Sequence, residues 1–206
     1  VLRPYFIAVR NGPRENLDMV THGNEGVLRA RFADAAYFVK HDVLKKLEDY
    51  LPRLDTLTFQ VKLGSMLDKV HRIEQLTLRI AAMVNLSGAD AQTAGRAAHL
   101  CKADLATQMV VDMTSLQGVM GREYALRDGE NPAVAVAIGE QYQPIPKTKP
   151  GLALALADRL DSLVGLFAAG LAPTGTKDPF GLRRAAIGVV QPLMEHALAL
   201  DLRAAV

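Results

Sequence analysis

The strongest constraint on the fold is an apolar repeat at steps of three and four residues between positions 63 and 83. The residues of the repeat are Leu63, Leu67, Val70, Ile73, Leu76, Ile80 and Met83. Because an α-helix has about 3.6 residues per turn, this spacing places the apolar side chains along one face. We therefore predict a long helix that buries this face and ends at Ser87-Gly88.

Other segments are also predicted to be helical, from apolar spacing and from start and stop signals. They cover residues 24–39, 41–53, 94–119, 132–142, 151–169 and 178–198. Pro52 is expected to stop the second of them. Asn131-Pro132 and Asp178-Pro179 each combine a capping residue with a proline, which is typical of a helix start.

One segment is predicted to be a strand: Tyr5–Arg10 (YFIAVR), which the turn signal Asn11-Gly12-Pro13 ends. Because a lone strand leaves unpaired backbone groups, residues 1–58 are expected to be the end of a preceding α/β domain with connecting helices. The rest of the chain, residues 59–206, is expected to be a helical bundle. With only 5% aromatic residues and no Trp, the composition favours a mainly α fold.

The charge is nearly balanced, with 24 Lys and Arg against 22 Asp and Glu and a formal net charge of +2. This excludes a strongly basic arm, so a nucleic-acid contact would need a local basic patch. The single Cys101 cannot form an internal disulfide, and no apolar stretch is long enough to span a bilayer. The chain begins at Val1 and is expected to be a piece of a longer cytoplasmic protein.

Common catalytic motifs are absent from the sequence: GxxxxGK[ST], GxGxxG, HExxH, GxSxG and CxxC. Cys101 lies on the apolar side of its predicted helix and is expected to be a core residue. The dipeptide His41-Asp42 could suggest a metal site, but Lys40, Lys45 and other charged residues surround it. We therefore expect it to lie on a solvated surface.

Three residues on different predicted helices, His71, Asp104 and Asp158, would converge if those helices pack together. This layout resembles the helical HD-type metal phosphohydrolases, in which a His, a His-Asp pair and a final Asp hold one or two metals that activate water. Here Ala103 stands where the second His is expected, and Lys102 adds a charge that opposes cation binding. We expect an HD-like fold without catalysis and no bound metal.

A second candidate site is the segment Pro173–Arg184 (PTGTKDPFGLRR). A glycine-containing loop with Lys177 leads into a helix N-terminus, where free N–H groups favour anions, and Arg183 and Arg184 follow. Such a place can hold an RNA phosphate. The alternative is a well-capped helix whose arginines are solvated or pair with Asp158 or Asp161.

Seven segments together resemble one family, the β subunit of the bacterial heterotetrameric glycyl-tRNA synthetase. They contain GNE followed by VLRAR (23–31), FQ followed by LG (59–64), KADL (102–105), LQGVMG (116–121), EQYQP (140–144), ADRLD (157–161) and DPF followed by LRRAA (178–186). The resemblance extends in order over nearly the whole chain. It implies a piece from the middle of that subunit, with an HD-like helical domain over residues 59–206 and without the anticodon-binding region.

The resemblance also implies a function and partners. In this family the α subunit makes glycyl-adenylate and transfers glycine, using ATP and Mg, while the β subunit supplies most tRNA binding. The expected partners are tRNA and the α subunit, with no membrane and no DNA, and the fragment itself is expected to hold no cofactor and no catalytic residue. The candidates for tRNA contact are Lys102, Lys177, Arg183 and Arg184.

The family typically lacks the complete HD metal set, so Ala103 agrees with membership. The resemblance favours interhelical ion pairs and hydrogen bonds for Asp68, Lys69, Asp158 and Asp161, and Asp68 can also reach Arg72 one turn along its helix. Two alternatives stay open. One is an active HD-type phosphohydrolase that uses His71, Asp104 and Asp158, and the other is a scaffold that only spaces neighbouring domains.

Overall fold

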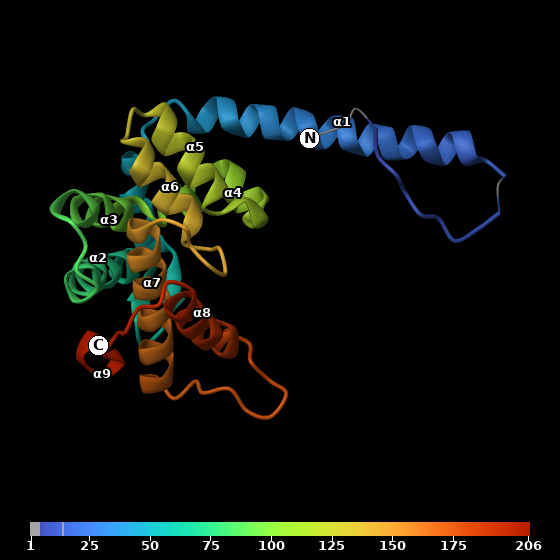
Figure 1. Ribbon diagram of the computed structural model, residues 1–206. Coiled ribbons are helices and arrows are strands. Elements are labelled where there is room, and N and C mark those ends of the chain that lie inside the picture. The colour runs from blue at the N-terminus through green and yellow to red at the C-terminus, as the bar shows by residue number, and fades with distance from the viewer. Residues whose placement is uncertain (1–4, 14) are drawn as a thin grey trace. The chain divides into compact units, whose positions relative to one another are not determined.

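The computed structural model describes residues 5–13 and 15–206, and it is mainly helical (Figure 1). Contacts within the chain divide it into two compact units, Val1–Phe38 and Val39–Val206. The smaller unit contains most of one long helix, α1 (Leu17–Asp42). The larger unit contains all the other helices and a short hairpin, and each unit is described by itself below.

In the smaller unit, the strand predicted over Tyr5–Arg10 is wrong, because the described residues 5–13 have no regular secondary structure. Ile7 and Val9 are 85% and 99% exposed. A strand exists only when a second strand accepts and donates its backbone hydrogen bonds, and the part of the chain that the structure describes provides none there. The helix predicted over residues 24–39 is confirmed and is longer at both ends.

The larger unit is built around α7 (Lys149–Ala168), which packs against α2 (Met66–Met83), α3 (Gly88–Leu100), α6 (Pro132–Glu140) and α8 (Leu182–Glu195). Figure 1 shows α7 in orange, running between these helices. Every residue from Pro150 to Ala157 is buried. Because this stretch is apolar on all sides, it forms the centre of the core.

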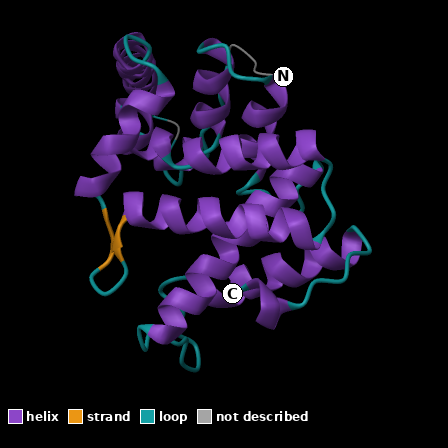
Figure 2. Ribbon diagram, turned by 90° about the vertical axis from the view of Figure 1, so that its left-hand side faces the viewer, coloured by secondary structure: helices purple, strands orange, loops and turns teal. Residues whose placement is uncertain are grey.

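The remaining elements of this unit are short. They are the 3-10 helices η1 (Leu47–Thr56), η2 (Ala103–Ala106) and η3 (Thr114–Leu116), the helices α4 (Gln108–Asp112), α5 (Val119–Arg127) and α9 (Leu202–Ala205), and the strands β1 (Thr58–Gln60) and β2 (Gly64–Ser65). Strands β1 and β2 pair antiparallel, and Figure 2 shows them as the orange hairpin beside the helices. This hairpin leads directly into α2.

The long helix predicted from the apolar repeat is α2, and its buried residues Val70, Ile73 and Ile80 belong to that repeat. Its start is fixed by a capping box in which Ser65 Oγ accepts from the Asp68 backbone N–H, while Asp68 Oδ2 accepts from the Ser65 N–H at 2.8 Å. The Asp68 carboxylate therefore binds Ser65 at the start of its own helix. The interhelical ion pair predicted for Asp68 is wrong, and this cap also takes the place of the expected contact with Arg72. Ser87 caps the start of α3 instead of ending α2.

The single helix predicted over residues 94–119 is wrong, because the chain breaks there into α3, η2, α4 and η3. Thr107 caps α4 by accepting from the Val110 N–H, and Gly118 has a φ of 76°. A side chain that bonds to a nearby backbone N–H competes with helix hydrogen bonds, and a positive φ ends a right-handed helix. These local features outweigh the continuous apolar spacing.

Of the two helix starts predicted from a capping residue and a proline, that of α6 is confirmed and the other is wrong, because α8 begins at Leu182 and not at Asp178-Pro179. Asn131 caps α6 with Pro132 behind it, and Thr148 caps α7. Pro52 does not stop its helix but lies inside η1. The sequence predicts a domain boundary after residue 58, whereas the contacts divide the chain after Phe38, and η1 packs against η2 and α2 in the larger unit.

The structure confirms the mainly α fold, while the HD-like arrangement of the bundle stays a prediction. Among the helices of residues 5–13 and 15–206, none has the length and apolar character needed to cross a membrane.

Candidate functional site

Five charged side chains meet at the interface of α2, α7 and the residue before η2. Asp158 lies on α7 and accepts from Lys69 Nζ of α2 at 3.0 Å and from Lys102 Nζ at 2.7 Å. Asp161, one turn further along α7, accepts from Lys69 Nζ at 2.8 Å and from Arg72 Nε at 2.6 Å. We call these five residues the lysine–aspartate cluster.

The cluster forms because charged residues repeat at three-residue spacing on two helices that pack together. Lys69 and Arg72 lie about one turn apart on α2, as Asp158 and Asp161 do on α7, so each helix presents two charges to the other. The predicted interhelical ion pairs of Lys69, Asp158 and Asp161 are thereby confirmed. Phe59 of the hairpin covers the cluster, with its ring centroid 4.5 Å from Lys69 Nζ.

The two lysines of the cluster are almost entirely withdrawn from solvent, each with 4% of its side chain exposed. Burial by itself lowers the pKa of Lys102, but the Asp158 carboxylate outweighs it and the pKa is raised. Burial likewise tends to raise the pKa of Asp158, yet the ammonium groups of Lys102 and Lys69 hold it well below the usual range. Both groups are therefore charged at neutral pH.

Tyr142, which the sequence analysis did not single out as a site residue, completes the environment of Lys102. Its hydroxyl accepts from Lys102 Nζ at 3.0 Å, and the ring centroid lies 4.4 Å from that nitrogen. In the same EQYQP segment, the Glu140 carboxylate accepts from the Thr148 N–H at 2.9 Å and the Gln141 amide donates to the Cys101 carbonyl at 2.8 Å. These side chains hold loops and helix ends in place.

The structure does not bring the HD-type positions together as a set of metal ligands. His71 is exposed on α2, Ala103 is buried without a ligating atom, and Asp158 is bonded to two lysines. Among the described residues, no three His, Cys, Asp or Glu side chains are grouped in a way that could hold a metal ion. The residues present do not fit the metal of an HD phosphohydrolase, because ammonium groups take the place of the cation beside Asp158.

Asp104 has a different role from that of a metal ligand. It is fully buried, and its Oδ2 accepts from the backbone N–H of Gly118 at 2.6 Å and of Gly121 at 3.1 Å, at the start of α5. Burial raises the pKa of Asp104, although the two backbone donors oppose this effect. The KADL and LQGVMG segments are thus linked by one carboxylate that binds the N-terminus of a helix.

The expectation that the dipeptide His41-Asp42 lies on a solvated surface is wrong for Asp42, which is buried. Its carboxylate accepts from the N–H groups of Gln108 and Met109 at 2.8 and 3.0 Å and from the Tyr124 hydroxyl at 3.0 Å. An acidic residue at the C-terminal end of a helix opposes the helix dipole. This unfavourable position of Asp42 is the only feature of the sequence that indicates a partner far along the chain.

The predicted basic segment lies between α7 and α8 and at the start of α8. Lys177, Arg183 and Arg184 are exposed, whereas Lys102, predicted as a fourth contact, is buried in the cluster and cannot reach a phosphate on the surface. Neither arginine pairs with Asp158 or Asp161. We call Lys177, Arg183 and Arg184 the basic loop.

The helix start beside the basic loop is already capped. Asp178 accepts from the N–H groups of Leu182 and Arg183 at 2.8 and 2.9 Å, and these backbone bonds lower its pKa. The expected free N–H groups are therefore occupied by the carboxylate of the chain itself. An anion at this place would have to be bound by the side chains of the basic loop.

Comparison with known proteins gives a consistent result along the whole chain. A family model described as glycyl-tRNA synthetase beta subunit matches residues 1–206. Proteins named glycine–tRNA ligase beta subunit from Trichodesmium erythraeum, Clostridioides difficile and Pseudomonas fluorescens are 50%, 48% and 48% identical to the chain. The alignments cover 98%, 98% and 100% of this chain but only 29%, 30% and 30% of those relatives, so the chain spans about three tenths of their length.

Proposed function

This chain belongs to the glycyl-tRNA synthetase beta-subunit family, and from this membership we propose that it is a module that binds and positions tRNA. In this proposal the chemistry of glycylation, with its ATP and Mg, takes place in the α subunit. The α subunit, in a heterotetramer, and tRNA are the partners of the complete β subunit in the cytoplasm. The module itself contributes no catalytic group.

The observation that supports tRNA contact within this chain is the exposure of the basic loop. Lys177 and Arg184 are exposed and form no ion pair within the described residues. The Arg183 side chain makes one hydrogen bond, from Nη2 to the Gly175 carbonyl at 2.7 Å. With Asp178 included, this short segment has a formal charge of +2, equal to that of the whole chain. Phosphate groups are the natural partners of such a concentrated charge.

The bonding of Asp158 in the lysine–aspartate cluster, and that of Asp104, which lies close to Lys102 in the sequence, support a structural role for these two HD-type positions. Lys102 and Lys69 neutralise Asp158, and Asp104 binds backbone N–H groups. A phosphohydrolase would need these carboxylates to bind a metal that activates water. The geometry therefore favours a binding module over a hydrolase.

The proposal is tested by reversing two charges of the basic loop in the complete β subunit, Lys177→Glu with Arg184→Glu. We expect tRNA affinity to fall by about tenfold or more, and the slope of log affinity against log salt to decrease by about one for each phosphate that the variant no longer binds. The matched control is Arg127→Glu with Lys147→Glu, since these two cations are also exposed and unpaired among the described residues. An unchanged affinity in the basic-loop variant would instead support a scaffold.

A further inference from the structure

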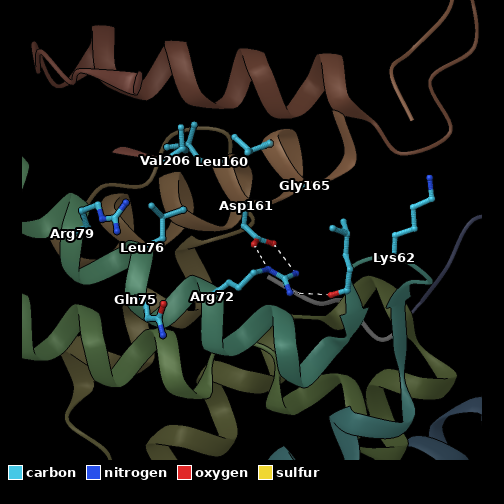
Figure 3. Close-up of a pocket in the computed structure, with 11 residues that line it drawn as sticks. Lys62, Arg72, Gln75, Leu76, Arg79, Leu160, Asp161, Gly165 and Val206 are labelled. Carbon is cyan, nitrogen blue, oxygen red and sulfur yellow. Dashed lines mark hydrogen bonds and ion pairs between the residues drawn. The ribbon is translucent and has the colours of Figure 1, made fainter. Parts of the chain in front are cut away.

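A groove of about 470 Å³ lies between α2 and α7, apart from the basic loop (Figure 3). Leu76, Leu160 and Val164 form apolar parts of its wall, and its cations are Lys62, Arg72 and Arg79. Figure 3 shows Lys62 and Arg79 near opposite ends, with Arg72 and Asp161 between them. We call this cavity the α2–α7 groove.

The groove has a net positive charge, because only one of its three cations, Arg72, is paired with a carboxylate of the lining. Its lining contains three cations and one anion, Asp161, which gives a formal charge of +2. The Asp161 carboxylate is already bonded to Arg72 and, from the buried side, to Lys69. An anionic ligand in the groove would therefore be attracted by the remaining cations without meeting an unpaired carboxylate.

Two of the three cations have donors to spare. Arg79 is exposed and forms no hydrogen bond or ion pair within the described part of the chain. Lys62 is exposed and its ammonium group donates to the Ala169 carbonyl at 3.1 Å, which leaves two of its three N–H groups free. Arg72, by contrast, uses its guanidinium on Asp161 and on the Leu63 carbonyl, so it contributes charge but few donors.

The spacing of the cations favours a chain of anions over a single one. Arg72 and Arg79 lie seven residues, or about two turns, apart on one face of α2, which separates them by about 10 Å along the helix axis. Gln75 and Leu76 lie between them on the same face and also line the groove. One inorganic phosphate can reach only one end, whereas a strand with a phosphate on each nucleotide can reach both.

The mixture of apolar and cationic walls favours an unpaired strand. In an RNA duplex the faces of the bases are stacked on one another, so they cannot cover the apolar wall. In an unpaired strand the faces of the bases and riboses are free to cover apolar side chains while the phosphates meet the cations. Gln75 is exposed and adds both a donor and an acceptor for a base edge or a ribose hydroxyl.

We infer that the α2–α7 groove binds a short unpaired segment of RNA, with its phosphates at Lys62 and Arg79 and its bases or riboses against the apolar wall. This inference rests on the proposed function, because the RNA would be a part of the bound tRNA. It extends that function to a second surface, which the sequence analysis did not identify. Lys62 and Arg79 belong to none of its candidate sets.

The test compares two neutralising double variants in the complete β subunit: Lys62→Gln with Arg79→Gln in the groove, and Lys177→Gln with Arg184→Gln in the basic loop. Arg127→Gln with Lys147→Gln is the matched control, because it removes the same charge elsewhere. Binding of fluorescent tRNA and of an unstructured pentaribonucleotide is measured by anisotropy, with inorganic phosphate as a competitor. Urea unfolding of each variant verifies that it is folded.

We expect the groove variant to bind both tRNA and the pentaribonucleotide about five- to tenfold more weakly than wild type, with a smaller salt slope. The basic-loop variant should lose affinity for tRNA but retain it for the pentaribonucleotide. The control should bind both as wild type does, and millimolar phosphate should not displace the pentaribonucleotide.

Three results would overturn the inference, and they are distinguishable from one another. If wild type binds tRNA and the groove variant binds both RNAs equally well, the groove inference fails while the proposed function stands. If no form of the β subunit binds tRNA, the proposed function and the groove inference fail together. If the groove variant instead loses assembly with the α subunit at unchanged RNA affinity, the groove holds a protein segment.

Discussion

Lys102 Nζ lies 2.7 Å from Asp158 Oδ2 and joins the segment after α3 to the middle of α7. The ammonium group also donates to the Tyr142 hydroxyl, and Lys69 binds the second oxygen of the same carboxylate. Each oxygen of the Asp158 carboxylate is therefore bound by a different lysine. This arrangement makes Lys102 a structural residue, in contrast to its predicted place among the tRNA contacts.

The first prediction concerns stability. Lys102→Met keeps most of the side-chain volume but leaves Asp158 with a single cation in a buried place, and breaking a buried pair in this way costs about 3 kcal/mol. Urea unfolding of the variant should show this loss in the free energy of unfolding. The matched control is Lys147→Met, in an exposed lysine without an ion pair among the described residues, which should change it by less than about 0.5 kcal/mol. A similarly small loss for Lys102→Met would contradict the structural role.

The second prediction concerns how the free energy of unfolding depends on pH through the surface ion pair of Glu48 with Arg96. The Arg96 guanidinium donates to both oxygens of Glu48, at 2.8 and 3.0 Å, and this bonding lowers the pKa of Glu48 from 4.5 to about 2. A carboxyl group whose pKa is lowered on folding stabilises the protein above its unfolded pKa, and this contribution is lost as the pH falls through the folded pKa. We therefore expect wild type to be more stable than Glu48→Gln at pH 6, and the difference to disappear between pH 4.5 and 2.

This pH dependence is measured by urea unfolding of wild type and variant at several pH values. Glu195→Gln is the control, because Glu195 is exposed and has no ion pair in the described structure. Its difference from wild type should stay small over the same range. A constant difference between wild type and Glu48→Gln down to pH 2 would show that the Arg96 bond is not what Glu48 contributes.

The third prediction concerns metal. Because Lys102 and Lys69 already neutralise Asp158, and Asp104 binds the Gly118 and Gly121 N–H groups, we expect the purified protein to retain no stoichiometric Mn, Fe, Ni or Zn. Elemental analysis checks this, and EDTA should leave the thermal midpoint unchanged. A stoichiometric metal that is lost on Asp104→Ala, together with phosphoester hydrolysis, would restore the phosphohydrolase alternative.

Much of the fold could be predicted from sequence where the determining contacts are local. Helix α2 is marked by its apolar repeat, α6 by Asn131 with Pro132, and α7 by its long apolar stretch, so these elements were found. The strand at Tyr5–Arg10 was not confirmed, because strand formation depends on partners elsewhere in the chain. The break between α3 and α5 was missed, because it depends on the side chains of Asp104 and Thr107 bonding to backbone N–H groups, which periodicity does not reveal.

The candidate site was predictable to a similar degree. The three-residue spacing placed Asp158 and Asp161 on a similar face, and the family resemblance favoured ion pairs that include Lys69, which are present. The burial of Lys102 could not be predicted, since its partners Tyr142 and Asp158 lie 40 and 56 residues away in the sequence. The α2–α7 groove was also missed, because Lys62 and Arg79 meet the same cavity only when α2 packs against α7.

The last prediction tests the glycine at the break before α5. Gly118 has a φ of 76°, and a Cβ atom there would lie 2.5 Å from a ring carbon of Tyr142. Gly118→Ala therefore combines the strain of a positive φ, about 1–2 kcal/mol, with displacement of the ring that covers Lys102. We expect it to lower the free energy of unfolding by about 3 kcal/mol in total.

Gly129 provides the matched control for this substitution, because its φ is 85° but nothing lies within 4 Å of its Cβ position. Gly129→Ala should show the cost of the backbone alone, about 1 kcal/mol. The difference between the two variants then measures the contact with Tyr142. Equal losses would mean that the ring moves without cost, and that Tyr142 does not hold Lys102 against Asp158 as the geometry indicates.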